Sequence, residues 1–147
     1  MPVQLRESAA RSAYLALVQV HEALSSSVSA LFKEHELTSA QFNVLRILVQ
    51  GPTEGCSCQD IKEQLIHRVP DVTRLLDRME AAGLVRRSRS ETDRRVVRVR
   101  ATARGRKRCE AMYEPLDALH EELFRGRLTR GELRDLDRLL RKVLRSD

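Results

Sequence analysis

The sequence predicts a mainly α-helical protein with one small β-hairpin. Apolar residues recur at helical spacing along most of the 147 residues, and only residues 85–101 change to the alternation typical of strands. Residue types that start and stop helices interrupt this pattern several times. Apolar side chains make up 41% of the chain and aromatic ones only 3%, so we expect one ordinary domain with an aliphatic core.

A long first helix is expected over residues 5–36. At about 1.5 Å per residue it would exceed about 40 Å, which is longer than the domain that carries it. Such a helix usually packs against something else, and a second subunit is the expected partner. The apolar positions that predict it are Ala9, Ala13, Tyr14, Leu17, Leu24, Val28, Leu31 and Phe32.

Two shorter helices follow, and each begins with a capping pattern. Thr38 and Gln41 form a capping box that opens the first, and Gly51-Pro52 ends it. Ser57 and Asp60 form a similar box with the shorter Asp in place of Glu. The residues expected to face inward are Phe42, Leu45, Leu48 and Val49 in the first helix and Ile61 and Leu65 in the second.

A third short helix is expected between Pro70 and Gly83. Proline suits the first helical position because its missing N–H has no partner there, and glycine suits the position after the last turn. Its inward face is predicted to be Val72, Leu75, Leu76 and Met79. Two strands follow at residues 85–89 and 96–101, joined by a polar turn at residues 90–94, with Val97 and Val99 on one face and Arg98 and Arg100 on the other.

The C-terminal part of the chain is expected to be helical again. Thr102 caps a helix that Pro115 should kink or interrupt, and Thr129 with Glu132 forms another capping box. The inward face of the last helix is predicted to be Leu133, Leu136, Leu139, Leu140, Val143 and Leu144. One small module cannot cover so much apolar surface, which favours a homodimer.

Three short helices followed by a hairpin predict a winged helix-turn-helix. In this arrangement the second helix of the turn enters the major groove of DNA, and the hairpin, or wing, reaches the phosphate backbone or the adjacent minor groove. The chain then divides into an N-terminal dimerisation helix (1–36), a DNA-binding module (37–101) and C-terminal dimerisation helices (102–147), all in one compact domain. Double-stranded DNA and a second copy of the chain are the expected partners.

The distribution of charge supports this interpretation. Residues 67–108 carry 14 Lys and Arg against 5 Asp and Glu, a net charge of +9, whereas residues 1–66 carry −2 and residues 109–147 carry −1. A basic centre between acidic flanks indicates a surface for a polyanion. A solvated basic loop is the alternative. No membrane partner is expected, because uncharged stretches such as Ser12 to His21 are too short for a span.

The chain also resembles the MarR-type transcription regulators over nearly its whole length. The resemblance is carried by "LTSAQFNVLRIL" from Leu37, "VTRLLDRMEAAGLVRR" from Val72 and "ETDRRVVRVRATARG" from Glu91. It implies a two-fold symmetric dimer on a pseudo-palindromic operator, acting as a repressor that a small ligand or an oxidant releases. Such a regulator acts in the cytoplasm, associated with the nucleoid. The segment "CSCQDI" departs from the family pattern by carrying two cysteines.

Both the family resemblance and the exposed positions of the predicted helices indicate candidate DNA contacts. The resemblance implies that Arg95 enters the minor groove and that Asp93 orients it. Exposed positions of the third short helix point to Thr73, Arg74 and Arg78, with Arg74 suited to a guanine edge or a phosphate. Asp71 either stabilises the helix start or accepts from a cytosine amine. Phosphate contacts are expected from Ser57, Gln59, Arg68 and Arg94.

A ligand site and a thiol site are further hypotheses. In the family the ligand lies between the dimer helices and the DNA-binding lobe, so an aromatic or phenolic effector would meet Arg11, Tyr14, His21, Phe42 and Tyr113. Plain core packing is the alternative for the aromatic residues. Cys56 and Cys58 are candidates for oxidant sensing, or with His67 for metal binding, although three ligands make a poor zinc site. Packing as small apolar side chains is the alternative for both cysteines. No cofactor and no metal is expected, and Cys109 is expected to be buried and inert.

Two other classes of function, an enzyme and a protein-binding adaptor, fit the sequence less well. An enzyme is disfavoured because the sequence has no glycine-rich phosphate loop, no His-Glu-x-x-His motif and no nucleophile with an evident histidine partner. A winged-helix adaptor for proteins should present a more apolar and less basic surface. Three cysteines without an apolar N-terminal leader favour the reducing cytoplasm.

Overall fold

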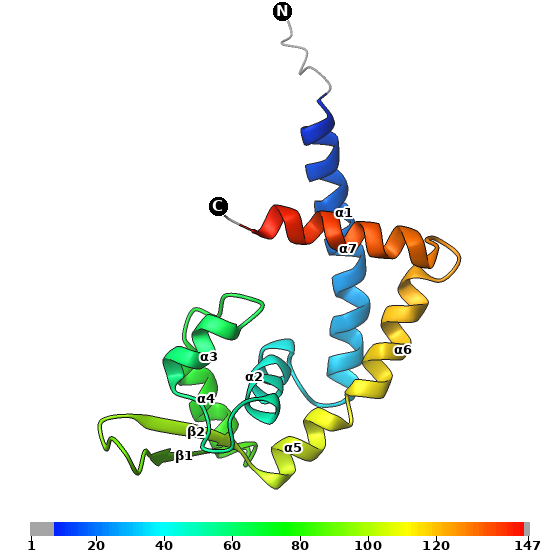
Figure 1. Cartoon of the computed structure of the whole chain (residues 1–147). Helices are drawn as coiled ribbons and strands as arrows, with labels where there is room; N and C mark the ends of the chain where they lie inside the picture. Colours follow the sequence, from blue (N-terminus) through cyan, green and yellow to red (C-terminus); the bar gives the residue numbers. More distant parts are fainter. Residues whose placement is uncertain (1–7, 146–147) are drawn as a thin grey trace, which may run out of the picture.

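The computed structural model describes residues 8–145 and confirms the mainly helical architecture with one antiparallel hairpin. Figure 1 shows a lobe built from α2 to α5 and the hairpin, with α1 and α6 extending away from it and α7 at the end of α6. The elements are α1 (Ala9–Glu34), α2 (Ser39–Gln50), α3 (Cys58–Gln64), α4 (Val72–Ala81), β1 (Val85–Arg89), β2 (Val97–Ala101), α5 (Ala103–Glu110), α6 (Tyr113–Phe124) and α7 (Arg130–Leu144).

The predicted capping boxes start their helices as expected. Thr38 and Gln41, Ser57 and Asp60, and Thr129 and Glu132 each exchange side-chain and backbone hydrogen bonds at the first turn. Hydrogen bonds from Ser57 hold the pKa of Asp60 below its ordinary value, and those from Thr129 lower the pKa of Glu132 in the same way. These local patterns therefore fix where α2, α3 and α7 begin.

The core lies inside the lobe, where α2 packs against α3, α5 and the hairpin. The inward residues predicted for α2 and α4 are buried or half-buried, and Ile61 of α3 is fully buried. Gly105 of α5 packs so closely on β1 that a Cβ atom would lie 2.0 Å from the carbonyl oxygen of Leu84. This close approach holds α5 against the base of the hairpin.

The start of α4 differs from the prediction. Pro70 precedes the cap instead of occupying the first helical position, and α4 begins at Val72. Asp71 is the N-cap, because its carboxylate accepts a hydrogen bond from the backbone N–H of Arg74 at 2.9 Å. The helix ends as expected, at Gly83 with φ of 72°, where the N–H of Leu84 reaches the carbonyl of Met79 at 2.9 Å.

The helix after the hairpin is interrupted as predicted, between α5 and α6. Pro115 lacks the N–H that would bond the carbonyl of Ala111 four residues before it. The chain accordingly leaves the helical pattern at Ala111 and Met112. The bend directs α5 along the lobe and α6 along α1 (Figure 1).

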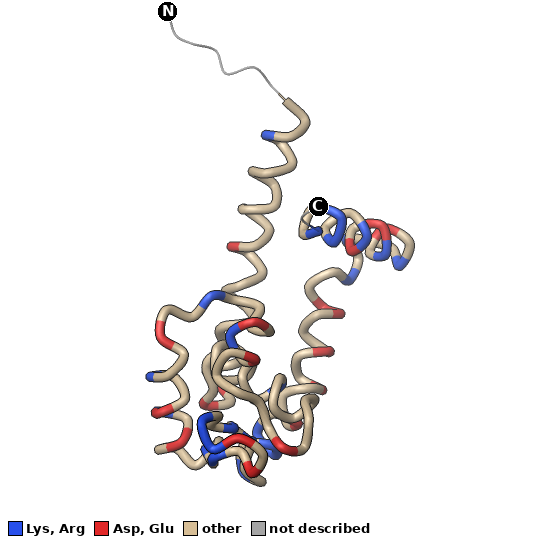
Figure 2. The backbone as a smooth tube through the Cα atoms, turned by 60° about the vertical axis from the view of Figure 1, so that its left-hand side comes forward, with Lys and Arg blue, Asp and Glu red and all other residues tan. Residues whose placement is uncertain are grey.

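The terminal helices are not covered within one copy of the chain. α1 spans Ala9–Glu34, shorter than expected, and residues 5–7 lie outside the described range. No residue of α7 is fully buried, and the predicted inward face is covered only in part. Leu133, Leu136 and Leu140 are half-buried, whereas Leu139, Val143 and Leu144 are exposed. Figures 1 and 2 together show α7 standing clear of α1. Exposed large apolar residues on these helices are Tyr14, Leu15, Leu17, Val18, Val20, Leu139, Val143 and Leu144.

The expectation that length excludes a membrane span is corrected by α1. Its best 18-residue window has a mean hydropathy of 1.3, because few charged residues interrupt the apolar run. Only 6% of that window is buried. Length and composition alone therefore do not separate α1 from a spanning helix, and a helix that packs against another copy of the chain has the same composition.

Candidate nucleic-acid interface

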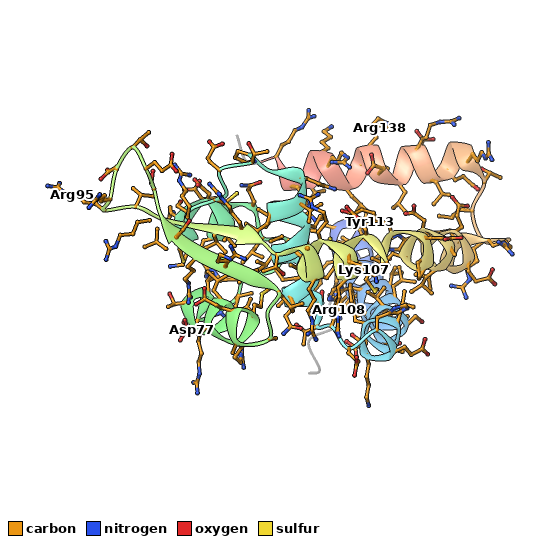
Figure 3. All side chains as sticks on the ribbon, turned by 90° about the horizontal axis from the view of Figure 1, so that it is seen from below. Asp77, Arg95, Lys107, Arg108, Tyr113 and Arg138 are labelled. Carbon is orange, nitrogen blue, oxygen red and sulfur yellow. The ribbon has the colours of Figure 1, made fainter. Side chains whose placement is uncertain are left out.

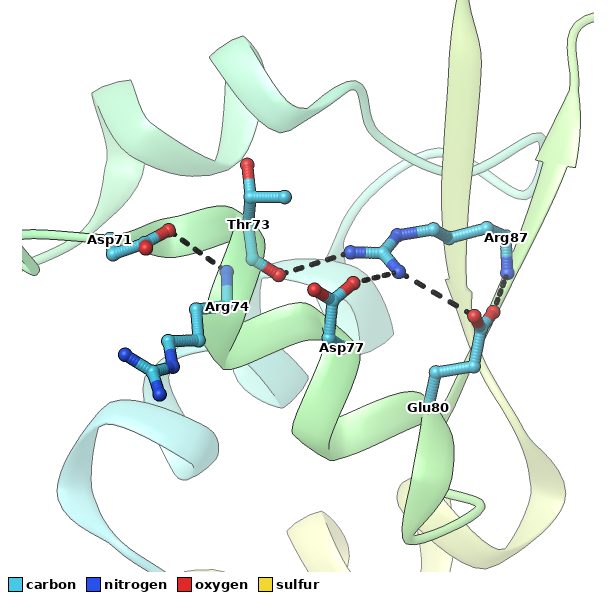
Figure 4. Close-up of polar contacts among 6 residues, drawn as sticks. All are labelled: Asp71, Thr73, Arg74, Asp77, Glu80 and Arg87. Carbon is cyan, nitrogen blue, oxygen red and sulfur yellow. Dashed lines mark hydrogen bonds and ion pairs between the residues drawn. The ribbon is translucent and has the colours of Figure 1, made fainter.

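The N-terminal half of α4 presents the predicted recognition residues to solvent. Val72, Leu75, Leu76 and Met79 bury one face of the helix, which leaves Thr73, Arg74 and Arg78 exposed on the others. Asp71 is committed to the cap of the helix, which agrees with the stabilising role among the two weighed for it. In Figure 4 the Arg74 side chain points away from Arg87 and the hairpin, and it is exposed.

The tip of the hairpin holds Arg95 at the far end of the lobe. Figure 3 shows its side chain projecting outward beyond the turn. Asp93 orients this residue through the backbone, since its carboxylate accepts the N–H of Arg95 at 3.0 Å. Among the described residues Asp93 forms no ion pair with the Arg95 guanidinium, so it orients Arg95 through this turn-forming hydrogen bond. Arg94 is also exposed at this tip.

Other arginines of the hairpin bind groups of the protein itself. Arg98 lies 3.5 Å from the carboxylate of Asp60, and Arg100 donates to the carbonyl of Glu54 at 2.9 Å. Arg89 donates to the carbonyl of Arg94 at 2.8 Å and so braces the turn. Val97 is 42% exposed, although it shares the Val99 face, because the strand extends past the core at this point. The arginines at the tip are therefore exposed, whereas Arg89, Arg98 and Arg100 are bound to groups of the protein.

The segment between α3 and α4 adds further polar and basic groups. A depression of about 650 Å³ lies there, with Gln59, Lys62, His67 and Arg68 among its lining residues. Arg68 is exposed, whereas Gln59 donates to Glu63 of its own helix at 3.0 Å. The Ser57 hydroxyl accepts the N–H of Asp60 at 3.1 Å, so it caps α3. Both side chains are therefore already engaged within α3, and a phosphate would need their remaining hydrogen-bonding capacity.

Arg87 was not among the DNA contacts predicted from the sequence, and the structure shows what it binds instead. Arg87 of β1 reaches across to α4, where its Nη1 atom lies 2.6 Å from the carboxylate of Asp77 and 3.5 Å from that of Glu80 (Figure 4). The signal that could have revealed it is the pair of acids on one face of α4, three residues apart. These contacts give Arg87 a structural role at the junction of α4 and β1.

The residues predicted to bind a ligand fall into two groups. Phe42 is buried and meets Tyr113 edge-on, with ring centroids 6.4 Å apart. Arg11, Tyr14 and His21 lie on exposed parts of α1, so one copy of the chain does not bring all five residues together. Sequence reasoning missed Arg46 of α2, whose Nε atom is buried without a hydrogen-bond partner among the described residues.

The cysteines do not form an evident reactive pair. Cys56 is 2% exposed and bridges to Val99 through the backbone, and burial raises the pKa of its thiol. Cys58 is partly exposed at the first turn of α3. Cys109 is buried as predicted, and burial raises its thiol pKa as well. Within residues 8–145 no group of His, Cys, Asp or Glu side chains is arranged to hold a metal ion.

Comparisons with known proteins agree with this geometry. The MarR family model matches residues 37–97. The transcriptional regulator FarR of Neisseria gonorrhoeae is 31% identical, over 97% of this chain and 96% of its own length. The homoprotocatechuate degradative operon repressor of Escherichia coli is 29% identical, over 88% and 86%. BpsR of Bordetella bronchiseptica, a protein whose DNA binding is regulated by 6-hydroxynicotinic acid, superposes over 100% of both chains with a TM-score of 0.77 and 26% identity.

Proposed function

Because this chain belongs to the MarR family of DNA-binding transcription regulators, we propose that it represses transcription as a homodimer on a pseudo-palindromic operator. Members of this family are regulators and not enzymes. The finer part of the proposal is that a small aromatic or phenolic molecule releases the protein from DNA. The observation that carries the DNA-binding role is the exposed Arg95 at the tip of a braced hairpin, beside an α4 that presents Thr73 and Arg74.

The proposed reading of DNA uses two grooves. Thr73, Arg74 and Arg78 on α4 meet the major groove, and Arg95 inserts into the adjacent minor groove, where a narrow A·T-rich segment attracts a cation. Arg94 and Arg68 contact phosphates, and the start of α3 at Ser57 and Gln59 lies against the backbone. Asp93 supports this binding by fixing the turn.

The proposed dimer is supported by the bare apolar faces of α1 and α7. Tyr14 is 65% exposed and Leu144 is 81% exposed, values that a second copy of the chain would reduce. Two-fold symmetry places the same faces of both copies against each other and repeats the DNA-binding lobe. Half-sites about one helical turn apart, ~10 bp, are the geometric expectation.

The proposed effector site lies near Phe42 and Tyr113. The unpartnered Nε of Arg46 favours an acidic group on the effector, and the two rings favour an aromatic body. Arg11, Tyr14 and His21 would join this site only in the assembled dimer. The action of 6-hydroxynicotinic acid on BpsR is consistent with an aromatic acid as effector. The relative from Escherichia coli is an operon repressor, which is consistent with repression by this chain.

The direct test is footprinting of the protein on the DNA upstream of its own gene, together with a salt titration of the affinity. Two protected half-sites and a steep loss of affinity with rising salt are expected, because bound arginines release counterions from the phosphates. A protein-binding adaptor would show no protection. Binding to chromosomal DNA also places the protein in the cytoplasm with the nucleoid as part of the same proposal.

A further inference from the structure

We propose that Arg87 is a positioning residue that holds the wing at a fixed separation from α4 and so sets the spacing between the major-groove and minor-groove contacts of one half-site. The inference rests on the proposed function. Arg87 itself belongs to β1, but its side chain makes its contacts on α4 (Figure 4).

The contacts of Arg87 run along one face of α4. Its Nη1 donates to Asp77 at 2.6 Å and to Glu80 at 3.5 Å, and its Nη2 donates to the backbone carbonyl of Thr73 at 3.1 Å. The backbone N–H of Arg87 donates to Glu80 at 2.9 Å. Positions 73, 77 and 80 span two helical turns on the same side, so a single guanidinium joins the strand to most of the length of α4.

A guanidinium suits this position better than an ammonium group would. Its planar fork holds several donors in fixed directions, whereas lysine carries a point charge on a flexible stem. The Arg87 side chain is 24% exposed, against 60% for Asp77 and 42% for Glu80, so the cation lies between the two elements and the acids lie at their edge. The geometry therefore restrains orientation as well as distance.

The restraint extends to both DNA-reading ends. Thr73, whose carbonyl Arg87 binds, is in the first turn of α4 next to Arg74. In the other direction β1 continues to Arg89, which braces the carbonyl of Arg94 at 2.8 Å, beside Arg95. Without the Arg87 side chain the hairpin would keep the backbone hydrogen bond from residue 87 to Glu80 and the buried Leu84 and Val85 at its base. It would lose the contacts to Asp77 and to the carbonyl of Thr73.

Charge neutralisation is the competing explanation, because Arg87 also offsets two carboxylates that would face a polyanion. Two DNA duplexes distinguish positioning of the wing from neutralisation of charge. The first is a duplex that the wild-type protein selects from a random pool, and the second carries one base pair inserted between the major-groove and minor-groove contacts of each half-site. Only a rigid protein should discriminate strongly between them.

The experiment measures the affinity ratio of the two duplexes for wild type, Arg87→Met, Arg87→Lys and a triple variant with Arg87→Met, Asp77→Asn and Glu80→Gln. We expect wild type to prefer the parent duplex by about tenfold or more, the size of a lost base contact. The ratio should fall to about twofold in Arg87→Met, lie between in Arg87→Lys, and stay low in the triple variant, in which all three side chains are uncharged.

An Arg87→Met protein that binds both duplexes more weakly but keeps the wild-type ratio would overturn the inference, and so would a triple variant with the wild-type ratio. Thermal unfolding by circular dichroism checks that each variant is folded, and Asp77→Asn alone provides a milder variant that should reduce the ratio partly. A wild-type protein that selects no duplex would overturn the proposed function as well, and this outcome is distinct from the other two.

Discussion

The carboxylate of Asp93 binds the backbone N–H of Arg95 at 3.0 Å, while the Arg95 guanidinium projects from the tip of the hairpin. The acid thus shapes the turn without neutralising the cation. A pre-formed turn reduces the conformational entropy that binding must remove, and the charge stays available to DNA.

Replacing the tip arginine should weaken operator binding without affecting assembly. We expect Arg95→Ala to cost about 1–3 kcal/mol of binding free energy, as measured by mobility shift at fixed salt. Arg127→Ala is a matched control, because Arg127 is an exposed arginine at the other end of the chain, between α6 and α7. Equal affinities of Arg95→Ala and wild type would contradict the wing assignment.

A charge on the stripe of α7 should disrupt the proposed dimer. Leu136→Asp or Leu140→Asp places a carboxylate on the face that a second copy would bury, and burial of an unpaired charge is strongly unfavourable. Light scattering should report a lower mass than for wild type. Arg134→Gln, on an exposed position of the same helix, controls for the change of one unit in net charge. An undiminished mass would show that α7 is not part of the interface.

The close approach of α5 to β1 makes a strong prediction about stability. Gly105→Ala should lower the free energy of unfolding by about 1–3 kcal/mol, because the new Cβ would meet backbone that cannot easily move. Denaturant titration followed by circular dichroism measures the loss. Gly131→Ala in α7 is the matched control, since its Cβ would have no neighbour nearer than 3.9 Å and alanine favours helix. Equal losses in both variants would contradict this account of the packing.

The capping carboxylates predict how acid acts on stability. The pKa of Asp60 is lowered by its hydrogen bonds to Ser57, so this group stabilises the fold above its unfolded pKa of about 4. The contribution is lost as the pH falls through the lower pKa of the folded state. Stability measured from neutral pH down to about pH 2 should therefore decrease, and the decrease should be smaller in Asp60→Asn. An unchanged slope in this variant would argue against the cap as its source.

Thiol labelling should separate the three cysteines. Cys58 is partly exposed, whereas Cys56 and Cys109 are buried and burial raises their thiol pKa values. We expect one thiol to react readily in the folded protein and three after denaturation, with Cys58→Ser removing the fast reaction. Rapid labelling of Cys56 would restore the hypothesis of a reactive Cys56 and Cys58 pair.

The sequence predicted the features that depend on near neighbours. Capping boxes at Thr38, Ser57 and Thr129 act within four residues, and the change of period at Val85 reports a strand directly. Pro70 was misplaced because Asp71 offered a better cap one residue later, and the two signals compete.

Features that depend on tertiary contacts were harder to predict from the sequence. The partners of Arg87 lie 7 to 14 residues earlier in the chain, so they meet only when the hairpin folds back on α4. The unpartnered Nε of Arg46 likewise depends on how α2 packs, which no periodicity reveals. The α7 stripe is half-buried in part and otherwise exposed, because a pattern shows that a face is apolar but not which molecule covers it.

The bare stripes of α1 and α7 also link the amount of this protein to its survival. A solitary chain leaves Leu139, Val143 and Leu144 in water, where proteases and chaperones recognise such surfaces. In the proposed homodimer, partner subunits would protect one another by mass action, so dilute protein would be disproportionately short-lived. A regulator built this way would disappear steeply, not gradually, once its synthesis slows.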